Sequence, residues 1–114
     1  MQIPKDGCLL RVFIGENDKW QGQPLYEAIV LKARELNLAG ATVLRGPMGF
    51  GASSRLHVAK ILRLSEDLPV IIEIVDARDK IDEFLPHLDG MVQEGLVTLE
   101  KVEVLKYRAR EISL

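Results

Sequence analysis

The stretch "LPVIIEIVD", Leu68 to Asp76, decides the fold. Its β-branched residues are typical of a β-strand, and no other segment of the sequence has so clear a strand pattern. Alternation places Ile72 and Ile74 on one face of a sheet. The opposite face then receives Ile71, Glu73 and Val75. Both faces are therefore at least partly apolar, and one layer of helices is too little to bury them.

The segments on either side of this strand also have patterns of regular structure. We expect strands over Cys8–Glu16, Ala41–Gly46 and Leu96–Tyr107, and a helix over Pro24–Leu36 with Pro24 as its first residue. The segment Leu56–Leu64 is compatible with a strand or a short helix. We favour extended structure there, because the connection between the second and third strands then becomes a hairpin-like arm.

A second helix is predicted after the decisive strand, because apolar residues recur at helical spacing from Ile81 to Val92. Asp76 or Asp79 is the expected N-terminal cap of this helix. Pro86 lies inside the pattern and predicts a kink or a lost hydrogen bond near Asp82.

The resulting order, β-α-β-β-α-β, predicts an α+β fold of the ferredoxin-like type, with two helices on one face of a four-stranded sheet. The first and third strands lie at the centre of such a sheet. Its second face is then partly apolar and carries the opposite charges of Arg11 and Glu73. Exposed apolar surface of this extent is typical of an interface. We therefore expect a homo-oligomer that associates through the face without helices.

Length and composition narrow the class of protein. The chain has 114 residues, which predicts one domain over residues 1–114. A net charge of −2 argues against nucleic-acid binding. One cysteine, Cys8, allows no internal disulfide, and with only two histidines a dedicated zinc site is not expected. The N-terminal "MQIPKDG" has no apolar signal segment, and no apolar run approaches the ~20 residues of a membrane helix, so we expect a cytoplasmic protein.

The candidate functional segment is "RGPMGFGASSR", Arg45 to Arg55, with glycines at 46, 49 and 51. Glycine lets backbone N–H groups approach an anion closely. The segment is not a P-loop, since Ala52 stands where the lysine would be, and the order G-x-x-G-x-G is not the dinucleotide fingerprint. On spacing alone, a hairpin tip that uses glycine for turns explains the segment equally well.

The placement of charge favours an anion site. Cations flank the glycines in an otherwise acidic chain, at Arg45, Arg55, Lys60 and Arg63. Lys106, Arg108 and Arg110 alternate near the C-terminus, so a strand there places them on one face. Cations and glycine N–H groups together suit a phosphate. A solvated, frayed terminus is the alternative explanation of the C-terminal cations.

The sequence resembles the bacterial and archaeal family called domain of unknown function 190. The resemblance is carried, in order along nearly the whole chain, by "LRVFIGE", "PLYEAIV", "AGATVLRGPMGFGASSR", "KILRLSEDLPVIIEIVD" and "EGLVTLEKVEV". That family resembles the PII signalling proteins in fold, which implies a homotrimer with nucleotide clefts between neighbouring subunits. Within it, "MGFG" (Met48–Gly51) is similar to the "KGFG" that opens the long loop of PII proteins. The tail "RAR" (Arg108–Arg110) is similar to the "RIR" that reaches nucleotide phosphates in PII proteins.

Two departures from PII limit what the resemblance implies. The segment "MVQEGLVTL" lacks the glycine-rich, lysine-bearing pattern of PII, and the long loop lacks the tyrosine that PII proteins modify. ATP specificity and uridylylation are therefore not implied, and AMP, ADP, ATP, a cyclic nucleotide or another anion stays open as the ligand. The expected ligand-binding residues are Arg45, Gly46, Met48, Gly49, Phe50, Gly51, Ser53, Ser54, Arg55, His57, Lys60, Arg108 and Arg110.

The leading interpretation is a trimeric PII-like sensor that binds an adenine nucleotide or similar anion, needs no cofactor or metal and has no catalytic residues. A membrane transporter is one candidate for its partner. One alternative is a small oligomeric hydrolase or isomerase that uses the same cleft, and another is an adaptor without a ligand. A triad of Ser53 or Ser54 with His57 and an aspartate has no spacing that fixes its geometry. Glu16, Asp18 and Trp20 are interpreted as a polar loop rather than a Mg²⁺ site. Met48 and Phe50 are expected to pack on a neighbouring subunit rather than stack on a base.

Overall fold

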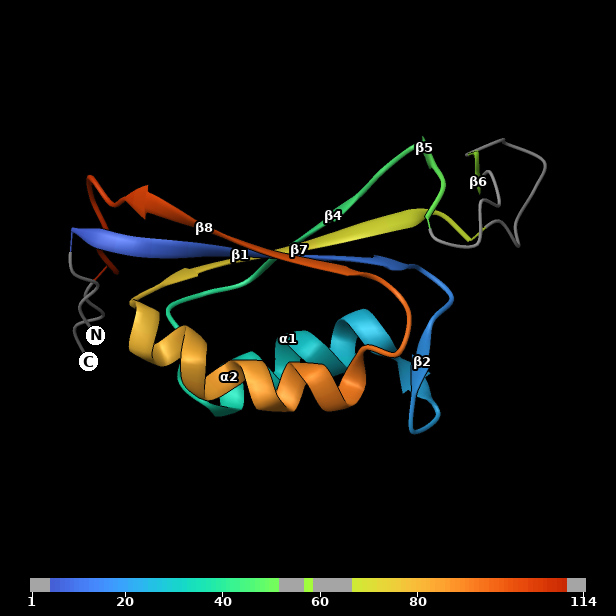
Figure 1. Ribbon diagram of the computed structural model, residues 1–114, viewed down its shortest axis with the longest axis horizontal. Coiled ribbons are helices and arrows are strands. Elements are labelled where there is room, and N and C mark those ends of the chain that lie inside the picture. The colour runs from blue at the N-terminus through green and yellow to red at the C-terminus, as the bar shows by residue number, and fades with distance from the viewer. Residues whose placement is uncertain (1–4, 52–56, 59–66, 111–114) are drawn as a thin grey trace.

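The computed structural model describes residues 5–51, 57–58 and 67–110. Four strands form an antiparallel sheet in the order β4 (Thr42–Arg45), β7 (Pro69–Asp76), β1 (Asp6–Gly15) and β8 (Leu96–Glu103). The helices α1 (Leu25–Glu35) and α2 (Arg78–Met91) both lie on one side of this sheet (Figure 1). The α+β, ferredoxin-like prediction is confirmed, and β1 and β7 occupy the centre as expected.

The face of the sheet that the helices cover holds the hydrophobic core. Side chains of β1 and β7 alternate strictly, so every second residue points toward the helices. The most deeply buried members, each at most 1% exposed, are Leu10, Val12, Ile72 and Ile74 of the sheet and Ile29, Ile81, Phe84 and Leu88 of the helices. Burying each such side chain stabilises the fold by about 1.5–3 kcal/mol.

The opposite face is here called the bare face, because neither of the two helices of the described residues covers it (Figure 1). Register pairs Leu9 with Val75, Arg11 with Glu73 and Phe13 with Ile71 across its centre. All six side chains are only half-buried. Leu44 of β4 and Leu96 of β8 extend this surface and are 46% and 57% exposed. The predicted distribution of apolar and charged residues on this face is therefore present.

The helix ends differ from prediction at the caps. Pro24 precedes α1 as its N-cap rather than serving as its first residue. Ala77 is the N-cap of α2, so the expectation that Asp76 or Asp79 caps this helix is wrong. Asp76 is 2% exposed, and its carboxylate accepts hydrogen bonds from the N–H groups of Ala39 (2.8 Å) and Ala77 (2.7 Å). It thereby joins the segment that leads into β4 to the start of α2.

Helix α2 continues through Pro86, which lacks the N–H that would bond to the carbonyl of Asp82. Helix α1 ends at Glu35 with Leu36 as its C-cap, and Asn37 follows with a φ of 60°, a conformation that asparagine tolerates. Within the described residues, the helices are too short or too polar to cross a membrane.

Two short hairpins lie outside the main sheet. Strand β5 (Met48–Gly49) pairs with β6 (His57–Val58), which agrees with the hairpin-like arm and with extended structure at these two residues of Leu56–Leu64. Strand β2 (Lys19–Trp20) pairs with β3 (Gln23–Pro24) and was not predicted. Its turn places Gln21 and Gly22 at positive φ, as in tight two-residue hairpins, but two-residue strands have no alternation to detect.

Candidate functional site

The arm is the connection between β4 and β7, residues 46–68. It begins where β4 ends, and Arg45 is the last residue of that strand. Arg45 pairs with Val70 of β7, and Val70 pairs with Ile14 of β1, so these three residues form a row across the sheet. Since Val70 and Ile14 are buried in the core, Arg45 projects on the helix-covered side. Its Nε contacts Oε2 of Glu16, which follows the end of β1. The guanidinium is therefore paired with a carboxylate at the edge of the core.

The backbone at Glu16 is held in place by two hydrogen bonds. The Glu16 N–H donates to the carbonyl of Leu68 at 2.8 Å, and the next N–H, of Asn17, donates to Asp67 Oδ1 at 2.7 Å. The Glu16 side chain is 24% exposed, whereas that of Arg45 is 60% exposed. Arg45 is thus the more accessible partner of the pair, and Glu16 is the more buried one, on a backbone that is hydrogen-bonded to the segment before β7.

Two glycines of the arm are explained by close packing on Pro69, the first residue of β7. A Cβ on Gly46 would lie 2.9 Å from Pro69 Cγ, and one on Gly49 would lie 3.1 Å from the same atom. The Gly46 N–H also donates to the Pro69 carbonyl at 2.8 Å. Among the described residues, a Cβ on Gly51 would meet nothing within 4 Å, so packing against them does not account for that glycine.

The apolar residues of the arm are exposed in the single chain. Met48 is 58% exposed and Phe50 is 71% exposed. Large apolar side chains this far from the core are typical of contact surfaces. Ser53, Ser54, Arg55 and Lys60 lie outside the described residues, and of His57 the structure describes only that its backbone belongs to β6.

The C-terminal cations do not lie on a strand. Strand β8 ends at Glu103, so the expectation that a strand through Tyr107 places Lys106, Arg108 and Arg110 on one face is wrong. After one further bond, from the Val104 N–H to the Lys5 carbonyl (2.7 Å), the chain leaves the sheet. It is anchored again where the Tyr107 hydroxyl donates to the Ala39 carbonyl at 2.7 Å. Arg108 and Arg110 follow this anchor and are exposed.

The arm and the C-terminal cations lie at opposite ends of the sheet. Gly46 bonds to Pro69, which pairs with Gly15 at the end of β1, whereas Glu103 pairs with Asp6 at its beginning. Strand β1 has ten residues, so these two points are about 30 Å apart. Figure 1 shows β5 and the end of β8 at the two ends of the sheet. One chain therefore does not bring Arg45 together with Arg108 and Arg110.

A charged cluster occupies the centre of the bare face. Arg11 donates from Nε to Glu73 Oε2 at 2.8 Å and from a terminal nitrogen to Glu100 Oε1 at 2.9 Å. The hydrogen bond to Glu73 is the main cause that raises the pKa of Arg11 above its usual value. A groove of about 680 Å³ runs beside this cluster, between the segment Ala39–Thr42 and the segment Val102–Tyr107. The groove is lined by Leu9 and Val75 as well as by the charges.

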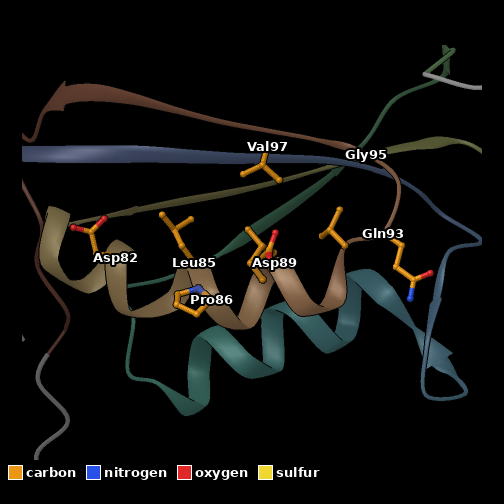
Figure 2. Close-up of a pocket in the computed structure, with 9 residues that line it drawn as sticks. Asp82, Leu85, Pro86, Asp89, Gln93, Gly95 and Val97 are labelled. Atoms are coloured by element: carbon orange, nitrogen blue, oxygen red, sulfur yellow. The ribbon is translucent and has the colours of Figure 1, made fainter.

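A second groove, of about 550 Å³, lies between α2 and the first residues of β8. Leu85 and Asp89 project into it from the helix, and Val97 projects from the strand (Figure 2). Asp82 at its rim accepts a hydrogen bond from Arg78 Nε at 2.9 Å, which raises the pKa of Arg78. Among the residues that the structure describes, no group of three or more His, Cys, Asp or Glu side chains is placed to hold a metal ion.

The family profile called DUF190, described as an uncharacterized ACR, matches residues 7–104. The chain belongs to the DUF190 family. A UPF0166 protein of Aquifex aeolicus is 40% identical over 97 residues, covering 85% of this DUF190 chain and 91% of the relative. The family prediction is thereby confirmed.

Two solved structures have a similar fold at low sequence identity. CPII of Thiomonas intermedia K12, a nitrogen regulatory PII-like protein solved with ADP, AMP and bicarbonate, matches with a TM-score of 0.64 and 15% identity, covering 89% of this chain and 90% of CPII. The divalent ion tolerance protein CutA1 of Ehrlichia chaffeensis matches with a TM-score of 0.58 and 9% identity, covering 92% and 87%. The DUF190 chain therefore has a PII-like fold. At these identities the likeness concerns the fold alone.

Sequence reasoning missed the partners of the predicted residues more than the residues themselves. It interpreted Glu16 as part of a polar loop. Glu16 directly follows β1, Arg45 ends β4, and both strands run antiparallel to β7. The two charges therefore lie at the same end of the sheet. Glu100 and the anchoring pair of Tyr107 and Ala39 were also missed. These contacts join residues 89 and 68 positions apart, which no local pattern reveals.

Proposed function

We propose that this protein is a PII-like regulator that binds an adenine nucleotide, or a similar phosphate-bearing anion, between neighbouring copies of the chain. One observation carries the proposal. The arm leaves the sheet at the end of β1, whereas the segment that carries Arg108 and Arg110 leaves it at the beginning of β1, about 30 Å away. A site that uses both sets of cations therefore needs two copies, with the arm of one beside the tail of the next.

The bare face is the surface proposed to bring the copies together. It combines half-buried apolar residues of β1 and β7 with exposed Leu44 and Leu96 at the two edge strands. A homotrimer, as the resemblance to PII proteins implies, buries this surface and sets neighbouring chains side by side. Met48 and Phe50 of the arm, both largely exposed in the single chain, then gain a neighbour to pack against.

In this arrangement Arg45 and the backbone of Gly49 and Gly51 meet the anion from one chain. Gly46 serves the site indirectly, because its N–H is already bonded to Pro69. Arg108 and Arg110 approach from the neighbouring chain and neutralise phosphate charge. Ser53, Ser54, Arg55, His57 and Lys60 are proposed to complete the site from the arm.

A regulator rather than an enzyme is the function that these residues support best. The arrangement supplies cations and N–H donors for an anion. Ligand binding is proposed to shift the arm between conformations and so to change what it presents to a partner protein, for example a membrane transporter. The similarity to CPII, solved with ADP, AMP and bicarbonate, supports nucleotides as the first ligands to test.

Calorimetric titration with AMP, ADP, ATP and cyclic nucleotides, each with and without bicarbonate, tests the proposal. Light scattering on the same samples gives the number of chains per particle. We expect binding of at least one nucleotide to a trimer, and loss of that binding in both Arg45→Ala and Arg108→Ala. A folded protein that binds none of these nucleotides, or that binds one as a single chain, overturns the proposal.

A further inference from the structure

The ion pair between Arg45 and Glu16 has a consequence for ligand binding that rests on the function proposed above. We infer that Glu16 is a built-in competitor for Arg45, which an incoming anion must displace before the arginine can bind it. The inference concerns how the affinity of the site is set, and it assigns a role to a residue that lies outside the glycine-rich arm.

The geometry supports displacement of Arg45 rather than of Glu16. The backbone of Glu16 is fixed by the bond from its N–H to the Leu68 carbonyl at 2.8 Å, and its side chain is only 24% exposed. Its Oε2 atom, which meets Arg45 Nε, is shielded from solvent. Arg45, by contrast, is 60% exposed and carries a long, flexible side chain. The guanidinium can leave the carboxylate by side-chain rotation alone, without movement of β4.

The contact also occupies the side of Arg45 that an anion needs. A guanidinium binds carboxylate and phosphate oxygens through the same planar set of N–H donors. While Nε is engaged by Glu16, fewer N–H donors of Arg45 are available to a phosphate. The apparent affinity is then the intrinsic affinity multiplied by the fraction of molecules in which Arg45 is released.

The size of the effect follows from the exposure of the pair. Partly exposed ion pairs are of modest strength, so Arg45 is released in about one fifth to one half of the molecules. Removal of the competitor should therefore raise the affinity by about two- to fivefold. The direction of the change in affinity distinguishes two roles of Glu16. If the carboxylate merely oriented Arg45 for its ligand, its removal would lower the affinity.

The test is calorimetric titration of the full chain with ADP, comparing the wild type with Glu16→Gln. The matched control is Glu35→Gln, at the far end of α1, where Glu35 is 66% exposed and pairs with Lys32. Both variants remove one negative charge, but only the first releases Arg45. We expect tighter ADP binding in Glu16→Gln and no change in Glu35→Gln. Should Glu16→Gln fail to fold, Glu16→Asp, which keeps the charge but shortens its reach, has the same expected direction.

Unchanged or weaker ADP binding in Glu16→Gln overturns the inference, and so does an equal gain in Glu35→Gln, because the effect is then one of net charge. These results leave the proposed function intact, provided that the wild type binds ADP and Arg45→Ala does not. If neither the wild type nor Glu16→Gln binds ADP or another nucleotide, the proposed function and the inference fail together.

Discussion

Adjacent isoleucines on β7 show how differently the two faces of the sheet are completed. Ile72 points toward the helices and is 0% exposed, whereas Ile71 points to the bare face and is only half-buried. The first is enclosed by side chains of its own chain. The second lies beside Phe13 and Leu44, and the part of the chain that the structure describes places no further helix or strand above it. One face is therefore covered by the helices of the same chain, whereas the other is the surface on which we expect a second copy to pack.

The largest expected effect follows from the enclosed isoleucine. Ile72→Ala removes buried methyl groups from a packed core and should lower the free energy of unfolding by about 3 kcal/mol, within the usual range of about 2–5 kcal/mol. Ile71→Ala makes the same chemical change on the bare face and should cost about 1 kcal/mol or less in dilute solution. Denaturant unfolding measures both. Equal losses would contradict the difference between the faces.

Protein concentration sharpens the same comparison. If copies associate through the bare face, the cost of Ile71→Ala grows as the protein is concentrated, because unfolding is then coupled to dissociation. The cost of Ile72→Ala should not change with protein concentration, because Ile72 is enclosed within a single chain. A concentration series of denaturation curves for the two variants separates a packing effect from an assembly effect.

A charge placed on the bare face should prevent association. Ile71→Glu puts a carboxylate where a partner is expected to exclude water, and we expect the dissociation constant of the oligomer to rise at least about 100-fold. Light scattering and sedimentation measure the change. The control is Leu31→Glu, which adds the same charge on α1 at a side chain that is 55% exposed. Dissociation by both variants would show that net charge, and not the bare face, is responsible.

The helix-covered side also depends on one buried carboxylate. Asp76→Ala leaves the N–H groups of Ala39 and Ala77 without their acceptor. Each buried bond lost costs about 1 kcal/mol or more, so unfolding should become easier by about 2 kcal/mol. Asp79→Ala, at an exposed carboxylate in the first turn of α2, is the control and should cost less than about 1 kcal/mol. A similar loss in both variants would mean that Asp76 acts through the helix dipole and not through its hydrogen bonds.

The sequence predicted the sheet well because its signals are local. Alternation in Leu68–Asp76 and helical spacing between Ile81 and Val92 depend on neighbours a few residues apart, and both elements are present. The caps were predicted wrongly because Asp76 is occupied by a tertiary contact with Ala39. The end of β8 was also missed, since nothing in "VEVLKY" signals that the pairing stops at Glu103.

The candidate site was less predictable for the same physical reason. Local spacing identified the glycines of the arm, but the close contacts of Gly46 and Gly49 with Pro69 appear only in the folded chain. The bonds from Arg45 to Glu16 and from Tyr107 to Ala39 join distant segments. Residue types and charges were therefore accessible from the sequence, while the partners of those charges were not.

The smallest expected effect concerns the charged cluster at the centre of the bare face. Arg11→Met removes the bonds to Glu73 and Glu100 and should lower the midpoint of thermal unfolding by at most a few degrees, because the cluster is open to solvent in the single chain. The hydrogen bond to Glu73 raises the pKa of Arg11 in the folded state. A group whose pKa is raised by folding stabilises the protein at every pH below its ordinary value, and this stabilisation is lost only as the pH rises through the folded value.

For an arginine this loss lies far above neutral pH, so the difference between wild type and Arg11→Met should stay constant between about pH 6 and about pH 9. Added salt, by contrast, should reduce the difference, because exposed charges are screened at about 0.5 M salt. Thermal melts at several pH values and two salt concentrations measure both dependences. If the protein assembles through the bare face, the cluster is covered in the oligomer and salt screens it less. A difference in thermal midpoint that is insensitive to salt only at high protein concentration would therefore place Arg11 inside the interface. A difference that changes across neutral pH would instead show that a group other than Arg11 controls the cluster.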